Sequence, residues 1–177
     1  SLDRFSGGRF LFGIGTGWLR EETELMGGDF VHRWTQTRDA IEVMKALWTH
    51  DEAEYHGQYF NFPLVRSYPK PAQKPHPPII LGGHAKNVLR RVVAHADGWL
   101  PNRITPAEIE TSRGQLDAMA KEAGRDPRSI TISVYGQAPD RTVVQSLLNA
   151  GADRVVVRPE HVETEAAMGE QLERMAE

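Results

Sequence analysis

Two glycine-rich segments of the chain have residue types that suit the binding of a phosphate group. The first is residues 13–18, GIGTGW, directly after an apolar run, and the second is residues 81–84, LGGH, directly after two isoleucines. Glycine has no side chain, so a ligand or a neighbouring backbone can come close to it. Backbone N–H groups at the start of a helix attract anions. Two such segments at strand ends together indicate a phosphate-bearing cofactor lying across those ends.

Other interpretations of both segments stay open. The first segment fits a dinucleotide-binding fingerprint poorly, because Trp18 stands where the third glycine of G-x-G-x-x-G belongs, and a helix and a hairpin follow. A tight strand-to-helix turn without a ligand also explains this segment. After the second segment, Lys86, Arg90 and Arg91 add positive charge, although the two adjacent arginines are also typical of a solvated helix face.

Strands and helices alternate along the chain and would place both segments at strand ends. Apolar runs bounded by glycine or proline predict strands at 9–14, 79–81, 97–100, 130–134 and 154–157, the first of them buried on both faces. Helical spacing and end signals predict helices at about 33–49, 85–96, 105–124, 142–150 and 163–176. A short hairpin is predicted at 54–62. This alternation predicts an α/β fold with a parallel sheet.

Composition and charge exclude several classes of protein. The chain has 177 residues, of which 40% are hydrophobic and 25% charged, with a net charge of −3 and no cysteine. This charge gives no indication of a nucleic-acid or membrane partner, and the lack of cysteine excludes disulfides and thiolate chemistry. Neither a signal peptide nor a membrane span is predicted, so a cytoplasmic protein is expected. His84 and His95 would lie too far apart along a helix to share a metal ion, so no metal is expected.

An ordered series of motifs gives the chain a resemblance to a known family. The series starts at residues 2–10, LDRFSGGRF, and runs through residues 13–22, GIGTGWLREE, to Arg33. Further matches are residues 47–49, 59–60, 69–83, 97–101 and 151–157. Over essentially its whole length the chain is similar to the bacterial luciferase-like oxidoreductases, and most similar to the branch that uses the deazaflavin coenzyme F420.

The resemblance implies a fold, a reaction and a set of binding residues. The family fold is a TIM (β/α)8 barrel with flavin or deazaflavin at the carboxyl ends of the strands. The implied reaction is hydride transfer between F420 and a small organic substrate, with FMN, which also supports monooxygenase chemistry, as the alternative cofactor. The motifs GTGW and DGWLP favour F420. The implied cofactor-binding residues are Thr16, Gly17 and Trp18 near the ring or its side chain, and Gly82, Gly83 and His84 at the phosphate.

The chain departs from the family pattern in its number of strands. Eight β/α units close a TIM barrel, whereas the strands predicted here correspond only to the family's fourth to eighth. We therefore expect residues 1–177 to form a single partial-barrel domain with a hairpin insertion near 53–63. It would be a fragment that lacks the N-terminal half, or a homo-oligomer that covers its edge strands. The alternative function is a catalytically incomplete half-barrel that self-assembles or only binds a phosphate-bearing ligand. The substrate and the catalytic acid and base are not assigned.

Several other side chains have a structural interpretation beside the functional one. Trp18 would line the cofactor ring or pack in the core, and Trp99 would close a strand end or line the pocket. Glu21 and Glu22 suit the first turn of a helix. The large apolar residues of the 33–49 helix are expected in the core, and these are Trp34, Met44 and Trp48.

Overall fold

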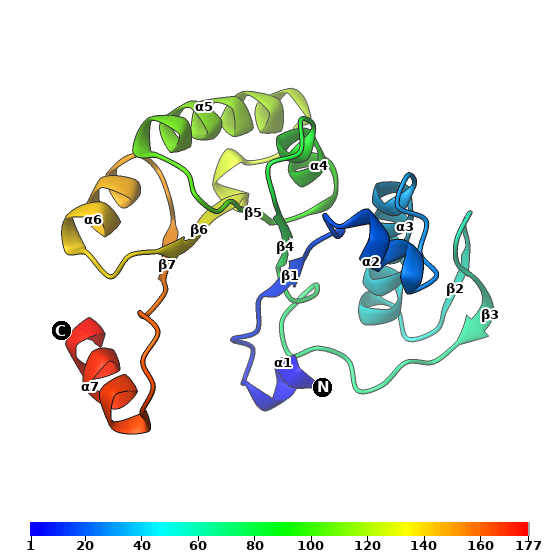
Figure 1. Cartoon of the computed structure of the whole chain (residues 1–177). Helices are drawn as coiled ribbons and strands as arrows, with labels where there is room; N and C mark the ends of the chain where they lie inside the picture. Colours follow the sequence, from blue (N-terminus) through cyan, green and yellow to red (C-terminus); the bar gives the residue numbers. More distant parts are fainter. Residues whose placement is uncertain (177) are drawn as a thin grey trace. The chain divides into compact units, whose positions relative to one another are not determined.

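The structure, a computed structural model, describes residues 1–176 and separates into two compact units (Figure 1). Unit 1 is Ser1–Ile80 and unit 2 is Leu81–Glu177. The division falls inside strand β4 (Ile79–Gly82), whose first three residues are buried. No helix among the described residues is long and apolar enough to cross a lipid bilayer.

The strands that carry the two glycine-rich segments belong to a sheet of five strands. In sheet order these are β1 (Phe12–Ile14), β4, β5 (Gly98–Leu100), β6 (Thr131–Gln137) and β7 (Arg154–Val157). β6 pairs in parallel with β5 on one side and with β7 on the other. The predicted α/β fold class, with a partial parallel sheet, is therefore confirmed.

Strand β1 is shorter and more exposed than the sequence predicts. The prediction was a strand over 9–14 with both faces buried, but β1 begins at Phe12, and Gly13 is exposed between two partly buried residues. β1 is the terminal strand in the sheet order. Successive residues of a strand point to opposite faces of the sheet, so one face of β1 is partly covered and the other is exposed. The prediction of two buried faces is wrong for this reason.

Helix α3 (Arg33–Thr49) is the longest element of unit 1, and its ends match the prediction. Two shorter helices, α1 (Leu2–Phe5) and α2 (Arg20–Leu25), are not predicted, because so few residues give no periodic pattern. Glu21 and Glu22 do lie in the first turn of α2, where their charge suits the helix dipole.

A buried carboxylate fastens the predicted hairpin to α3. The hairpin consists of β2 (Ala53–His56) and β3 (Asn61–Val65), which pair antiparallel. Asp39 of α3 is 6% exposed and accepts hydrogen bonds from the Tyr55 hydroxyl at 2.6 Å and the Tyr59 N–H at 2.8 Å. These bonds hold the pKa of Asp39 below its usual range, and the carboxylate raises the pKa of Tyr55 to about 12.

The predicted core residues of α3 are less buried than expected. Ile41 is fully buried, whereas Trp34, Met44 and Trp48 are only partly covered. Trp48 instead makes an edge-on contact with the half-buried Phe12 ring, with centroids 5.6 Å apart. The Trp48 and Phe12 rings therefore pack against each other while partly exposed, and the smaller Ile41 is fully buried.

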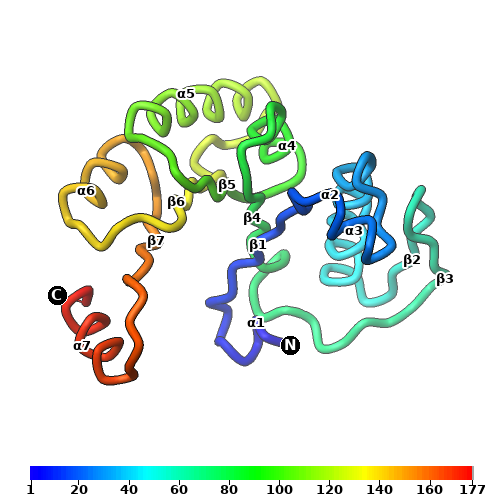
Figure 2. Tube along the Cα trace, viewed as in Figure 1, coloured from blue at the N-terminus to red at the C-terminus, as the bar shows by residue number. Residues whose placement is uncertain are grey.

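Unit 2 has helices between its strands, as predicted. They are α4 (Val88–His95), α5 (Pro106–Glu122), η1 (Pro127–Ser129), α6 (Arg141–Asn149) and α7 (Glu165–Ala176). Figures 1 and 2 show α4, α5 and α6 along one side of β5, β6 and β7. The fully buried side chains of this layer include Val92, Ile109, Leu116, Ile132, Val134 and Leu147. The burial of these apolar side chains is the main source of stability for the helices and strands that hold the strand ends in place.

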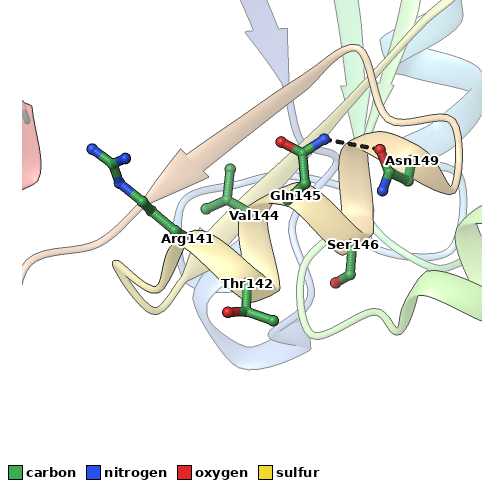
Figure 3. A pocket seen from close by; sticks show the side chains of 6 residues that line it. All are labelled: Arg141, Thr142, Val144, Gln145, Ser146 and Asn149. Atoms are coloured by element: carbon green, nitrogen blue, oxygen red, sulfur yellow. Dashed lines mark hydrogen bonds between the residues drawn. The ribbon is translucent and has the colours of Figure 1, made fainter.

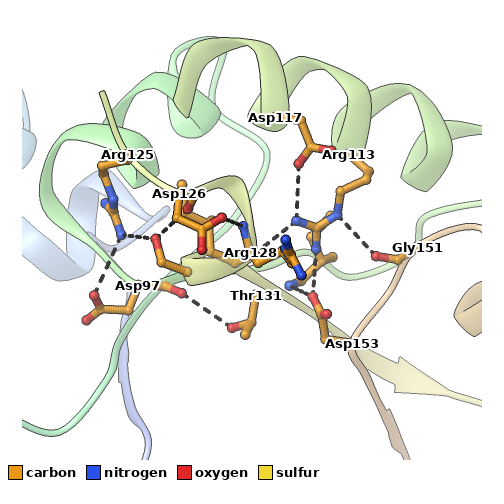
Figure 4. A network of polar contacts seen from close by, with 12 residues as sticks. Asp97, Arg113, Asp117, Arg125, Asp126, Arg128, Thr131, Gly151 and Asp153 are labelled. Atoms are coloured by element: carbon orange, nitrogen blue, oxygen red, sulfur yellow. Dashed lines mark hydrogen bonds and ion pairs between the residues drawn. The ribbon is translucent and has the colours of Figure 1, made fainter. Parts of the chain in front are cut away.

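A polar network fixes the amino ends of two strands in unit 2 (Figure 4). Arg113 of α5 donates to the Asp153 carboxylate at 2.6 Å and to the carbonyls of Ile130 at 2.9 Å and Gly151 at 3.3 Å. The same Asp153 carboxylate accepts the N–H of Ile132 at 2.7 Å. Because these residues lie at the starts of β6 and β7, the network sets where both strands begin and so where their carboxyl ends lie.

Candidate functional site

The second glycine-rich segment forms an open turn at the carboxyl end of β4. Gly83 has a φ of +100°, a conformation that favours glycine, and its N–H donates to the Leu100 carbonyl of β5 at 3.3 Å. A Cβ built at Gly83 would meet no atom within 4 Å. α4 begins at Val88 rather than at the predicted residue 85, so residues 83–87 form a loop. The space beside Gly83 is therefore open to a ligand.

This loop has backbone donors that suit an anion. Within residues 1–176, the N–H groups of His84, Ala85 and Lys86 make no hydrogen bond, and all three residues are exposed. The Lys86 ammonium adds a positive charge to the same loop. Unpaired N–H groups beside a glycine turn and a cation are the donor set that phosphate oxygens prefer, so the residues present fit a cofactor phosphate.

Two contacts hold the loop against the end of β5. The His84 Nε2 lies 2.6 Å from the Asn102 carbonyl oxygen and 2.9 Å from its Oδ1, and the Asn102 backbone N–H points at the same Nε2 at 3.2 Å. The Trp99 indole Nε1 donates to the Gly83 carbonyl at 2.8 Å, and its ring meets the His84 ring edge-on. Trp99 is 3% exposed. Trp99 lies within β5, and its indole fixes the turn after β4.

A pocket of about 340 Å³ lies beside this loop, between it and α5. Its lining residues are His84, Trp99, Ile104, Ala107, Glu108, Thr111, Ser112 and Gln115. Glu108 is the acid of the pocket, but it is engaged in the predicted capping box, where it accepts from the N–H and the hydroxyl of Thr105. The Thr105 hydroxyl lowers the pKa of Glu108. This carboxylate therefore stays ionised and caps α5, and we do not assign it as a catalytic acid.

The first glycine-rich segment begins within β1 of unit 1 and continues beyond its end, where an arginine holds it. Gly17 has a φ of +80°, and its carbonyl accepts from Arg33 Nε at 3.2 Å. Arg33 also donates to the Phe30 carbonyl at 2.6 Å and lies over the Phe30 ring. Trp18 is 83% exposed and so is not part of the core of unit 1, while Thr16 is partly buried. The role of Thr16, Gly17 and Trp18 beside a cofactor ring stays a prediction.

A second pocket, on the surface of α6, lacks the features of a catalytic site. Its volume is about 610 Å³, and one helix supplies all the side chains that line it: Arg141, Thr142, Val144, Gln145, Ser146 and Asn149 (Figure 3). The Ser146 hydroxyl donates to the Val143 carbonyl, and Gln145 donates to Asn149. No three His, Cys, Asp or Glu side chains among residues 1–176 are grouped to hold a metal ion. We therefore place the candidate site at the β4 and β5 ends.

Asn102 is a residue of this site that the sequence does not predict. It lies just after β5, and its side chain reaches His84 across the parallel strand ends. The only local signal is its place two residues after the DGWL motif. Its contact with His84 depends on the pairing of two strands, which no local pattern gives.

A parallel α/β sheet with glycine-rich turns at the carboxyl ends of its strands defines a class of proteins that bind ligands at that edge. Within this class, the chain belongs to the family described as luciferase-like monooxygenase, whose sequence pattern it matches over residues 1–170.

Two sequence relatives and one solved structure of similar fold are examples of proteins to which the chain is similar. An uncharacterised protein of Mycobacterium tuberculosis is 35% identical over 159 residues, which cover 89% of this chain and 54% of that protein. The FMNH(2)-dependent dimethylsulfone monooxygenase of Pseudomonas putida is 26% identical over 137 residues, 76% of this chain and 37% of that enzyme. The structure of the coenzyme F420 dependent tetrahydromethanopterin reductase from Methanopyrus kandleri superposes with a TM-score of 0.70 at 18% identity, covering 94% of this chain and 73% of that one. The chain spans about half the length of the curated relatives it matches.

Proposed function

We propose that this chain is part of an oxidoreductase that transfers a hydride between F420 and a small organic substrate, with FMN as the alternative cofactor. The observation that supports this most directly is the open Gly82–Gly83–His84 turn, with its unpaired N–H groups and the positive φ of Gly83. The chain has the fold of an F420-dependent reductase and is similar in sequence to an FMNH(2)-dependent monooxygenase, and the GTGW and DGWLP motifs favour F420.

Two segments of the chain would bind different parts of the cofactor. Gly82, Gly83 and the N–H groups that follow would hold the cofactor phosphate, and Thr16, Gly17 and Trp18 would lie near its ring or side chain. The bound deazaflavin or flavin would supply the hydride chemistry. The protein would position the cofactor and exclude water from the site. Sedimentation of the purified protein would measure whether the functional assembly is a homo-oligomer.

The test is a fluorescence titration of the purified chain with F420 and, separately, with FMN. Gly83→Ala is the informative variant, because it adds a Cβ to the open turn and strains its backbone. Gly124→Ala is the matched control, since Gly124 also has a positive φ, of 70°, and also has open space where a Cβ would lie. Both substitutions strain the backbone by about 1–2 kcal/mol, but only Gly83 lies in the proposed phosphate site.

The proposal expects saturable binding, tighter for F420 than for FMN, and a loss of about ten-fold or more in affinity for Gly83→Ala. Gly124→Ala should bind as the parent chain does. Equal affinity of all three proteins would exclude the phosphate site at Gly83. The absence of any binding to either cofactor would favour the alternative, an incomplete half-barrel.

A further inference from the structure

One residue beside the candidate phosphate site has an unusual backbone conformation. Arg103 has a φ of 45°, and it is the one non-glycine residue in the described part of the chain with a positive φ. A left-handed conformation is unfavourable for a residue with a Cβ, and an arginine gains nothing from it locally. Such conformations persist only where the neighbouring residues impose them, and they are concentrated at sites that bind ligands.

The neighbours of Arg103 do impose its conformation. Asn102, just before it, forms a bridge to Tyr135 of β6 and contacts His84 at 2.6 Å through its carbonyl oxygen. Ile104, just after it, is 9% exposed and packs in the core of unit 2. With both flanking residues anchored, the chain passes through the left-handed region at Arg103. The arginine is thereby held directly after Asn102, the residue that contacts His84 in the loop that carries Gly83.

The Arg103 side chain has no partner of its own in the described chain. It is exposed, and its guanidinium makes no hydrogen bond or ion pair with any of residues 1–176. This differs from Arg113 and Arg125 of the same unit, which are engaged with carbonyl and carboxylate oxygens. A guanidinium on a fixed backbone, with all its donors available, is well suited to a carboxylate, which it can bind with two parallel hydrogen bonds.

The two candidate cofactors differ in the groups that lie beyond the phosphate. The FMN side chain ends at the phosphate, whereas that of F420 continues into a chain of carboxylates. Arg103 directly follows Asn102, which contacts His84 of the Gly83 loop at 2.6 Å, so it would be a cation on the strand end next to a phosphate held at Gly83. A cation there discriminates between the two molecules, because only one of them has a carboxylate to offer.

We propose that Arg103 is a specificity-determining residue that selects F420 over FMN by pairing with a carboxylate beyond the phosphate. This inference rests on the proposed function. It also explains why a strained arginine stands at this position, since a glycine there would relieve the strain but would lose the charge.

The experiment measures the affinities of the purified chain for F420 and for FMN by fluorescence, in the parent and in Arg103→Gln. The expected result is a loss of about ten-fold for F420, the effect of one charge-assisted hydrogen-bonded pair, with unchanged affinity for FMN. Arg103→Lys should keep part of the F420 affinity. Arg174→Gln is the matched control, because Arg174 is an exposed arginine of α7 with no partner in the described chain, and it should change neither affinity.

A second variant separates binding from folding. Arg103→Gly removes the charge and also relieves the positive φ, so its melting temperature should rise while its affinity for F420 falls. A purely structural role of Arg103 would move both quantities in the same direction or leave binding unchanged.

Three other outcomes would overturn this inference, and the last of them would overturn the proposed function as well. Equal losses for F420 and FMN would place Arg103 at the phosphate and overturn its role in selection. Unchanged affinities for both cofactors in Arg103→Gln, with Gly83→Ala still impaired, would overturn the inference and leave the proposed function standing. A parent chain that binds neither cofactor would overturn the proposed function and this inference together.

Discussion

The Trp99 indole donates a 2.8 Å hydrogen bond to the carbonyl oxygen of Gly83, and so one buried ring fixes the turn proposed to hold the cofactor phosphate. The bond joins β5 to the end of β4 and orients the peptide that follows Gly83. The N–H groups of the loop depend on this orientation, although Trp99 itself offers no donor to the cofactor.

Replacing Trp99 by phenylalanine should weaken cofactor binding while the chain still folds. The variant keeps an aromatic ring but loses the donor, a loss of about 1 kcal/mol, which corresponds to roughly five-fold in affinity. Fluorescence titration with F420 measures this effect. Trp48→Phe, in unit 1, is the control and should bind as the parent does. Unchanged binding in Trp99→Phe would show that the loop keeps its orientation without the indole.

The Arg113 network should make a large contribution to the stability of unit 2. Arg113→Met keeps most of the aliphatic stem but leaves the Asp153 carboxylate and the carbonyls of Ile130 and Gly151 without this donor. We expect a loss of about 2–3 kcal/mol in the free energy of unfolding, measured by urea denaturation. The same substitution at the exposed Arg90 should change stability by less than about 0.5 kcal/mol. Similar effects at both positions would contradict a special role for the network.

Gly57 is required by the close approach of the hairpin to α3. A Cβ at this position would lie 2.6 Å from the Asp39 Oδ2 and would also collide with the Tyr55 ring. Gly57→Ala should therefore destabilise the chain by about 1–3 kcal/mol, as overpacking does. Gly114→Ala provides the contrast, because that glycine lies within α5 with nothing within 4 Å. It should stabilise the chain by about 0.5–1 kcal/mol, and thermal melts of the two variants should shift in opposite directions.

The Asp39 carboxylate should make stability depend on acid pH. Its pKa is lowered in the folded chain, chiefly by the hydrogen bond from Tyr55 and then by the Tyr59 N–H. Its contribution is therefore fully present above the unfolded pKa of about 4, and it is lost as the pH falls through the lower folded pKa. Urea midpoints measured across this acid range should fall more steeply for the parent than for Asp39→Asn. Parallel curves would show that this carboxylate is not linked to folding.

Local signals in the sequence predict much of the fold, and non-local strand pairing explains most of the differences between the predicted and the observed elements. Thr105 and Glu108 mark the start of α5 correctly, because a capping box involves only the first turn of a helix. β6 extends beyond its predicted end at 134 to Gln137, since it includes an irregular register at Tyr135 with a positive φ at Gly136. In the sequence alone, Gly136 indicates the end of a strand.

In the candidate site, too, local signals predict some of the residues and the pairing of strands determines the others. The Gly82–Gly83 pair is visible in the sequence because both glycines stand together at the end of an apolar run. Asn102 and Arg103 are not visible, since each gains its importance from the parallel pairing of β5 with its neighbours. The positive φ of Arg103 is likewise imposed by tertiary contacts and is against the local preference of arginine.

The division of the chain inside β4 determines where the molecule can be cut, permuted or joined to a reporter. Ile79, Ile80 and Leu81 are at most 4% exposed. A break between the two compact units at this point would create new termini in a buried strand, with apolar side chains in water and ladder groups unpaired. The mostly exposed stretch 66–69, after β3, is the better place for new ends. A split form of this protein should therefore have its fragments meet at that surface stretch and keep β4 whole.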